Sequence, residues 1–183
     1  MAKVCTNEKT SARQRWIENG LLELMQERIF DEITVTDLCQ YLPLSRRSFY
    51  RYFHDLEDVL ESLMDHTMQD MAIINSVPTI PELENYCAFW LERKSLLSAL
   101  SRSNMHSKLA HYTLKYSNSD ALEQNLSRED LDMDLGAEIN LFVVSGLSSL
   151  LISWHQEGFR KTPGDMARIA MRLLFKPLLK QPG

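Results

Sequence analysis

A capping box followed closely by a proline constrains the fold of this chain more than any other sequence feature. In the segment TVTD at 34–37, the Thr34 hydroxyl can accept a bond from the Asp37 amide, and the Asp37 carboxylate can reach back to the Thr34 amide. Pro43 biases the residue before it away from helical angles. The pattern predicts a short helix over 35–41 that ends in a turn at 42–44.

Ser45 is a second capping residue, and it predicts another short helix over 46–53. Phe49 and Phe53 are four residues apart, so they share one face of that helix, which we expect to be buried. Helix, short turn and helix in this order form a helix-turn-helix. The opposite face then carries Arg46, Arg47, Tyr50, Arg51 and His54.

The rest of the chain is also predicted to be helical, because glycine is scarce and apolar residues recur at helical spacing. Further helices are expected over 10–28, 56–75, 81–103 with a break near Lys94, 105–116 and 134–157, and a last helix opens at Thr162-Pro163. The segment SVPTIP at 76–81 is the clearest linker, and the acidic stretch 118–138 is expected to be mobile. The predicted fold class is all-α.

Composition excludes several classes of protein. The chain has 183 residues and a net charge of −5, so it does not coat nucleic acid or anionic membranes through bulk charge. Cys5, Cys39 and Cys87 lie too far apart to indicate a disulfide framework or a zinc site, which favours a reducing cytoplasm. The uncharged run 139–154 is shorter than the roughly 20 residues of a membrane helix. We therefore expect it to be a buried helix and predict no membrane contact.

The segment LSRRSFYRYFHD at 44–55 concentrates arginine and tyrosine, although the chain as a whole is negatively charged. No carboxylate lies between Leu38 and Phe53 to neutralise these cations. Arginine can donate two hydrogen bonds to guanine in the major groove, and tyrosine can reach a phosphate or a thymine methyl. The alternative is a charged face that is merely solvated. The cap, the turn and the flanking helices favour the interpretation that this face binds DNA.

The segment ITVTDLCQYLPLSRRSFYRYFHDLEDVL resembles the DNA-binding region of tetracycline-repressor-type (TetR-family) transcriptional regulators, over roughly residues 10–64. The C-terminal FVVSGLSSLLISWHQEGFRKTPGDMARIAMRLL is similar to the last two helices of the branch that contains dihydroxyacetone-kinase regulators. The resemblance implies an N-terminal three-helix helix-turn-helix domain, residues 1–55, joined by a long helix to a C-terminal effector and dimerisation domain, residues 56–183. It also implies a homodimeric, sequence-specific repressor that binds a palindromic operator in double-stranded DNA.

The resemblance assigns roles to individual residues. Thr36 is expected to contact the DNA backbone, Arg46, Arg47 and Ser48 the base edges, and Tyr50, Tyr52 and His54 the phosphates. The complete predicted DNA-binding set is Thr36, Ser45, Arg46, Arg47, Ser48, Tyr50, Arg51, Tyr52 and His54. Four positions depart from the family pattern: Leu42, Pro43 and Arg47 replace small residues or glycines, and Leu56 replaces a phosphate-contacting lysine.

The last two predicted helices carry more apolar surface than a two-helix tail can hide alone. A four-helix bundle across a two-fold axis would bury it, with small residues near Gly146 allowing close approach. The predicted dimer interface is Phe142, Gly146, Leu147, Leu150, Trp154, Ile169 and Leu173.

A small-molecule effector is expected between the linker and the long helix, although each candidate residue is individually more typical of core or surface. The predicted effector set is Tyr86, Trp90, His111, Tyr112 and Asn140. The sequence offers no nucleophile–base pair, phosphate-cradling loop or metal-ligand spacing, so we expect no enzyme activity, metal or cofactor. The alternatives are a DNA-bound dimer controlled by a protein partner, and an all-α enzyme with an incidental helix-turn-helix.

Overall fold

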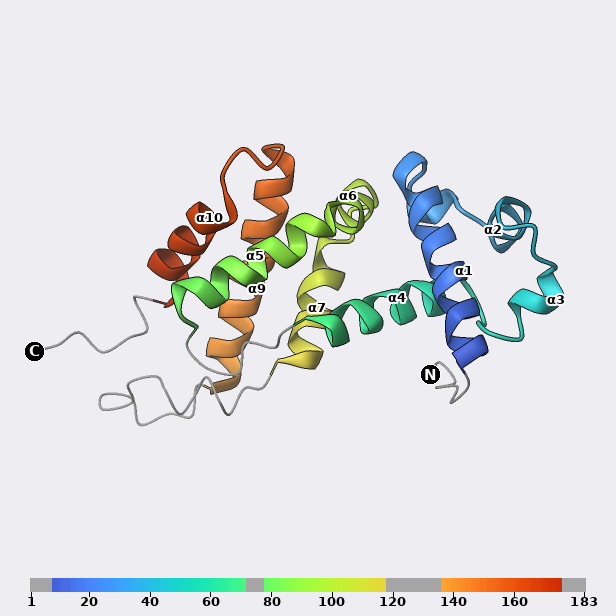
Figure 1. Cartoon of the computed structure of the whole chain (residues 1–183), viewed down its shortest axis with the longest axis horizontal. Coiled ribbons are helices and arrows are strands. Elements are labelled where there is room, and N and C mark those ends of the chain that lie inside the picture. The colour runs from blue at the N-terminus through green and yellow to red at the C-terminus, as the bar shows by residue number, and fades with distance from the viewer. Residues whose placement is uncertain (1–7, 72–77, 118–135, 176–183) are drawn as a thin grey trace, which may run out of the picture. The chain divides into compact units, whose positions relative to one another are not determined.

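The structure is a computed structural model that describes residues 8–71, 78–117 and 136–175 (Figure 1). All regular elements in these ranges are helical, which confirms the predicted all-α class. The chain divides into two compact units, one of residues 1–70 with 98–104 and one of residues 71–97 with 105–183. Most of the stretch predicted to be mobile, residues 118–135, lies outside the described residues.

The N-terminal unit is built around α1 (Glu8–Glu27), which packs against α4 (Leu56–Asp70). A 3₁₀ turn (Phe30–Glu32) leads into α2 (Val35–Tyr41) and α3 (Arg46–Phe49), as the blue and cyan ribbons of Figure 1 show. Its fully buried side chains include Ile17, Leu21, Leu38, Phe49 and Leu60. Because α4 packs on α1, it belongs to this unit rather than to a C-terminal domain that begins at residue 56.

The predicted helix starts are confirmed in this unit. Thr34 Oγ1 accepts from the Asp37 amide at 3.1 Å, and Asp37 Oδ2 accepts from the Thr34 amide at 2.7 Å. Ser45 Oγ accepts from the Ser48 amide at 3.1 Å and so caps α3. Asp55 Oδ1 accepts from the Asp58 amide at 2.8 Å at the start of α4. Capping side chains therefore fix the first turns of α2, α3 and α4.

The second helix of the motif is shorter than the sequence predicts. It ends at Phe49 rather than Phe53, because the amides of Tyr52 and Phe53 both donate to the Phe49 carbonyl, at 2.9 and 3.1 Å. The chain thus turns tightly after one helical turn. Phe53 is nevertheless buried beside Phe49, with ring centroids 6.1 Å apart.

Leu42, which replaces a small residue of the family pattern, is accommodated by α1. Its side chain is buried against Gly20, where an added Cβ would lie 2.6 Å from Leu42 Cδ1. Real Cβ atoms do not approach this closely, so any larger residue at position 20 would force the Leu42 side chain to move. Because Gly20 has no side chain, α1 leaves the space that the large Leu42 side chain fills.

The C-terminal unit contains α5 (Ile80–Glu92), α7 (His106–Tyr116), α9 (Gly136–Gln156), α10 (Pro163–Ala170) and a π-helical turn (Met171–Phe175). Helix α10 packs against α5, and α9 packs against α7 and the π-helical turn. Helix α6 (Lys94–Arg102) follows the predicted break, and its residues from Ser98 onward group with the N-terminal unit. The sequence missed the capping box of α5, in which Thr79 and Glu82 bond each other's amides.

Helix α9 is the apolar helix of this unit. Within the described ranges, the stretch Ala137–Gln156 is long and apolar enough to cross a membrane, with a mean hydropathy of 1.4, so its length alone does not exclude that role. Its inner side is buried at Val143, Leu147 and Leu151, where it packs against the rest of the unit. The arrangement is that of a core helix. It is followed by Gly158, whose φ of 70° is the left-handed conformation common just after a helix end.

Candidate nucleic-acid interface

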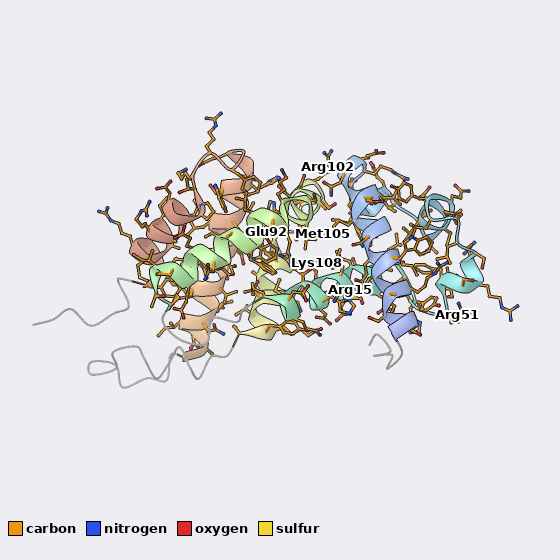
Figure 2. All side chains as sticks on the ribbon, viewed as in Figure 1. Arg15, Arg51, Glu92, Arg102, Met105 and Lys108 are labelled. Atoms are coloured by element: carbon orange, nitrogen blue, oxygen red, sulfur yellow. The ribbon has the colours of Figure 1, made fainter. Side chains whose placement is uncertain are left out.

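The face of α3 opposite the buried phenylalanines presents cations and phenols to solvent. Phe49 and Phe53 are 0% and 1% exposed, whereas Arg46, Arg47, Tyr50, Arg51 and His54 are exposed as predicted. Figure 2 shows Arg51 extending from the end of α3 away from the body of the N-terminal unit. This face has the size and donor chemistry that the major groove accepts.

Two of the arginines are paired with tyrosines. Arg46 Nη2 donates to the Tyr50 hydroxyl at 3.4 Å, and this hydrogen bond raises the pKa of Arg46. Arg51 Nη2 donates to the Tyr52 hydroxyl at 3.0 Å, with its guanidinium 4.9 Å from the centre of the Tyr52 ring. Arg47 makes no hydrogen bond, ion pair or ring contact with the part of the chain that the structure describes. Arg47 is therefore the arginine of α3 that is free to take a new partner.

The smaller members of the predicted set lie at helix starts. Thr36 is exposed in the first turn of α2, and Ser45 is exposed just before α3. Ser45 Oγ also donates to Ser48 Oγ at 2.9 Å, which holds Ser48 at the surface of α3. The structure therefore brings all nine predicted DNA-binding residues onto α2, α3 and the turn before α4, with none fully buried.

The acids nearest to this face are already engaged. Asp37 lies 3.4 Å from Arg28, and hydrogen bonds from Thr34 lower the pKa of Asp37 below its usual value. Asp58 Oδ2 accepts from the His54 amide at 3.0 Å. Leu56 is only 7% exposed, so it fills the core instead of taking the place of the family's phosphate-contacting lysine. The exposed face of α3 therefore keeps a local positive charge.

The predicted effector residues are only partly brought together. Tyr86 and Asn140 line a cavity in the C-terminal unit, together with residues of α7 and of the π-helical turn. Trp90 and Tyr112 are buried and His111 is exposed on α7, and none of the three lines this cavity. The sequence reasoning missed Thr113 and Ser117, which could have been found because they share a helical face with Leu109 and Tyr116.

The predicted dimer residues separate into two groups. Phe142 and Leu173 are 58% and 57% exposed, and Leu150 and Ile169 are half-buried. By contrast, Leu147 and Trp154 are buried within the chain, and the Trp154 indole donates to the Lys161 carbonyl at 3.0 Å. Gly146 receives the side chain of Leu174, which a Cβ would approach to 2.5 Å. These three residues pack the inside of the unit, so their assignment to the dimer surface is corrected.

The architecture and the exposed basic face of α3 define a helix-turn-helix protein with a separate helical C-terminal unit. The fold is that of TetR-type transcriptional regulators, as the sequence resemblance implied.

Individual proteins support this assignment. The structure of a TetR transcriptional regulator from Streptococcus agalactiae superposes with a TM-score of 0.65 at 17% identity, covering 91% of this chain and 95% of that one. The dihydroxyacetone kinase operon activator DhaS gives 0.60 at 16% identity, with coverages of 90% and 95%. The fatty acid degradation regulator FadR from Bacillus halodurans gives 0.57 at 12% identity, with coverages of 92% and 97%.

In sequence, the chain is 28% identical over 69 residues to the HTH-type dhaKLM operon transcriptional activator DhaS of Lactococcus lactis. This match covers 38% of the chain and 37% of that relative, so the chain is aligned with little more than a third of the relative's length. No family model matches the chain.

Proposed function

We propose that this chain is a sequence-specific DNA-binding transcriptional regulator. The observation that carries the proposal is the exposed face of α3, where Arg47 is unpaired while Arg46 and Arg51 are held by tyrosines. An arginine that is free and exposed on a groove-sized helix can bind the O6 and N7 atoms of guanine. The regulators of similar fold support the same function.

We propose further that the protein acts in the cytoplasm as a homodimer on a palindromic operator. Phe142 on α9 and Leu173 in the π-helical turn that follows α10 are exposed apolar side chains. Pairing these segments across a two-fold axis would cover them and would present two copies of α3. Two-fold symmetry in the protein then requires half-sites whose centres are roughly 34–36 Å apart on one side of the DNA.

The test is selection of bound fragments from sheared chromosomal DNA with the purified protein, followed by measured affinities for one selected fragment and for random DNA. Arg47→Ala should weaken specific binding by about 1–3 kcal/mol and relax the preference at one position in each half-site. Arg160→Ala is the matched control, because Arg160 is exposed in the loop between α9 and α10. A protein that selects no fragment over random DNA, or an Arg47→Ala variant with unchanged specificity, contradicts the proposal.

The family resemblance implies a repressor, and activation is the second candidate. Both the matched relative and one of the similar structures carry the name of an operon activator. In vitro transcription from a promoter that contains the selected fragment separates the two, since a repressor lowers the transcript level and an activator raises it.

Control by a small molecule is the first candidate for regulation, and control by a protein partner is the alternative. We propose no catalytic activity and no cofactor, because the sequence holds no catalytic constellation and the proteins of similar fold are regulators. Within the described residues, no three histidine, cysteine, aspartate or glutamate side chains come together as a metal site would require.

A further inference from the structure

A short segment from the second half of the sequence belongs to the N-terminal unit. The segment Ser98–Asn104, which contains the end of α6, groups with residues 1–70, whereas the residues on either side of it in the chain group with the C-terminal unit. Within the segment, Ala99 and Leu100 are fully buried. The unit that carries the helix-turn-helix is therefore discontinuous in sequence, and residues before α5 do not complete it alone.

Ser103 joins this segment to the turn that precedes α2. Its hydroxyl accepts a hydrogen bond from the Phe30 amide at 2.9 Å, across a separation of 73 residues in sequence. The Ser103 amide donates to the Ala99 carbonyl at 3.1 Å, which holds Ser103 at the C-terminal end of α6. Both partners of the long-range bond lie within the N-terminal unit.

This bond takes the place of a local helix cap. Phe30 is the first residue of the 3₁₀ turn Phe30–Glu32, and the first amides of a helix have no partner within it. Ile29, which precedes the turn, has no side-chain acceptor and makes no capping bond. A serine next to a helix start usually supplies such an acceptor. Here Ser103 supplies it from a distant part of the sequence.

The capped turn leads directly into the first helix of the helix-turn-helix. Ile33 follows the turn and is only 6% exposed, and Thr34 then caps α2. Before the turn, Arg28 lies 3.4 Å from Asp37 in the first turn of α2. Helix α2 packs against both α1 and α3. The start of α2 is therefore held directly by Arg28 and, through the turn, by Ser103.

We propose that Ser103 is a positioning residue for DNA recognition: by capping the turn before α2, it sets the position of α2 and α3 on α1. This role rests on the proposed function as a DNA-binding regulator. Ser103 is uncharged, so it adds nothing to the phosphate attraction that holds DNA of any sequence. Its loss should therefore impair recognition of one sequence and leave non-specific attraction unchanged.

The test compares the full-length Ser103→Ala variant with the natural protein on the selected DNA fragment and on random DNA of equal length. Without the bond, only a fraction of the molecules hold α2 in the binding-competent position. The apparent Kd for the selected fragment should then rise by about 5-fold, as the loss of one net hydrogen bond predicts. The Kd for random DNA should stay within about 2-fold, because phosphate attraction tolerates a displaced helix. A variant that is merely less stable would lose affinity for both DNAs by the same factor.

Two further variants serve as controls. Ser103→Thr keeps a hydroxyl at the same position, so it should restore the Kd for the selected fragment to within about 2-fold of the natural value. Ser98→Ala is the matched control, because Ser98 lies in the same segment and its hydroxyl has no hydrogen-bond partner among the described residues. It should bind both DNAs as the natural protein does.

Amide hydrogen exchange in the absence of DNA gives an independent measurement. The Phe30 amide should be protected in the natural protein and should exchange about 5-fold faster or more in Ser103→Ala. The Asp37 amide, which donates to Thr34 Oγ1 at the start of α2, should lose protection in the same variant. Ser98→Ala should change neither amide.

Equal loss of affinity for both DNAs in Ser103→Ala, or no loss for the selected fragment, overturns the positioning role. Failure of Ser103→Thr to restore binding, or an unprotected Phe30 amide in the natural protein, overturns it as well. If the natural protein selects no DNA fragment, the proposed function fails instead. Exchange at Phe30 and Asp37 would then still decide whether Ser103 holds the start of α2.

Discussion

His66 Nδ1 lies 3.0 Å from both carboxylate oxygens of Glu18, and this contact joins α4 to α1 inside the N-terminal unit. The Glu18 side chain is only 1% exposed, and Ser62 Oγ donates to its Oε1 at 2.7 Å. A buried carboxylate is stable only where donors replace its lost water. The two α4 side chains provide those donors and so fix the position of α4 on α1.

Ser62→Ala should therefore lower the free energy of unfolding by about 1.5–3 kcal/mol, because it leaves a buried charged acceptor short of one donor. In a Glu18→Gln background the same substitution should cost less, since the acceptor is then uncharged. Urea unfolding of the four proteins of this double-mutant cycle measures the coupling. Additive effects, with no coupling between the two sites, would show that the Ser62 hydrogen bond does not stabilise the unit.

Gly20→Ala tests the close approach of α1 to the turn. The added Cβ would lie 2.6 Å from Leu42 Cδ1, so the Leu42 side chain must move, at a cost of about 1–3 kcal/mol. In a Leu42→Ala background the clash disappears, and the same substitution should stabilise α1 by up to about 1 kcal/mol through helix propensity. Thermal unfolding measures the effect of Gly20→Ala on stability in each of the two backgrounds. A destabilising effect of equal size in both backgrounds would contradict the packing described here.

Phe142→Glu or Leu173→Glu should convert the proposed dimer into soluble monomers. Both side chains are more than half exposed in one chain, so the charge should leave the fold of the monomer intact while it opposes burial at an interface. Ile29→Glu is the control, because Ile29 is 39% exposed and lies in the N-terminal unit, outside the helices that carry Phe142 and Leu173. Light scattering measures the molar mass of each variant and so distinguishes monomers from dimers. Dimers of unchanged stability in both α9 and π-turn variants would place the interface elsewhere.

The cap of α10 predicts a specific response to acid. A hydrogen bond from the Thr162 hydroxyl, and then one from Arg168, lower the pKa of Asp165 from the usual 3.8 to about 2. Because the folded state holds this carboxyl ionised, the stabilisation is complete above about pH 4 and is lost as the pH falls toward 2. NMR titration of the Asp165 carboxyl should find its midpoint near pH 2. The stability difference between Asp165→Asn and the natural protein should shrink over the same range.

The local signals of the helix-turn-helix made that part of the fold predictable from sequence. A capping box, a proline and a second cap lie next to one another in the chain, so the bonds that set the helix ends are local. The length of α3 was not predictable in the same way. Both Tyr52 and Phe53 bond to the Phe49 carbonyl, and helical periodicity alone does not distinguish that turn from one more turn of helix.

The cavity of the C-terminal unit was less predictable, because its wall depends on how five separate segments pack. Tyr86 and Asn140 were expected from residue type, but Trp90 was expected by the same reasoning and lies outside the cavity. The dimer assignment failed at Gly146 for a related reason. A small residue indicates close approach by some neighbour, and here the neighbour is Leu174 of the same chain.

In the proposed DNA interface, the arginine–tyrosine pairs of the α3 region would lower the entropy cost of binding. Arg46 with Tyr50 and Arg51 with Tyr52 are already ordered before DNA is present, so binding costs them little of the roughly 0.5–1.5 kcal/mol that immobilising a flexible side chain takes. Arg47 has no such hydrogen bond to another side chain among the described residues. The braced pairs would therefore bind DNA with little loss of side-chain entropy, whereas Arg47, which lacks a partner among the described residues, would lose its rotamer freedom when it meets a base.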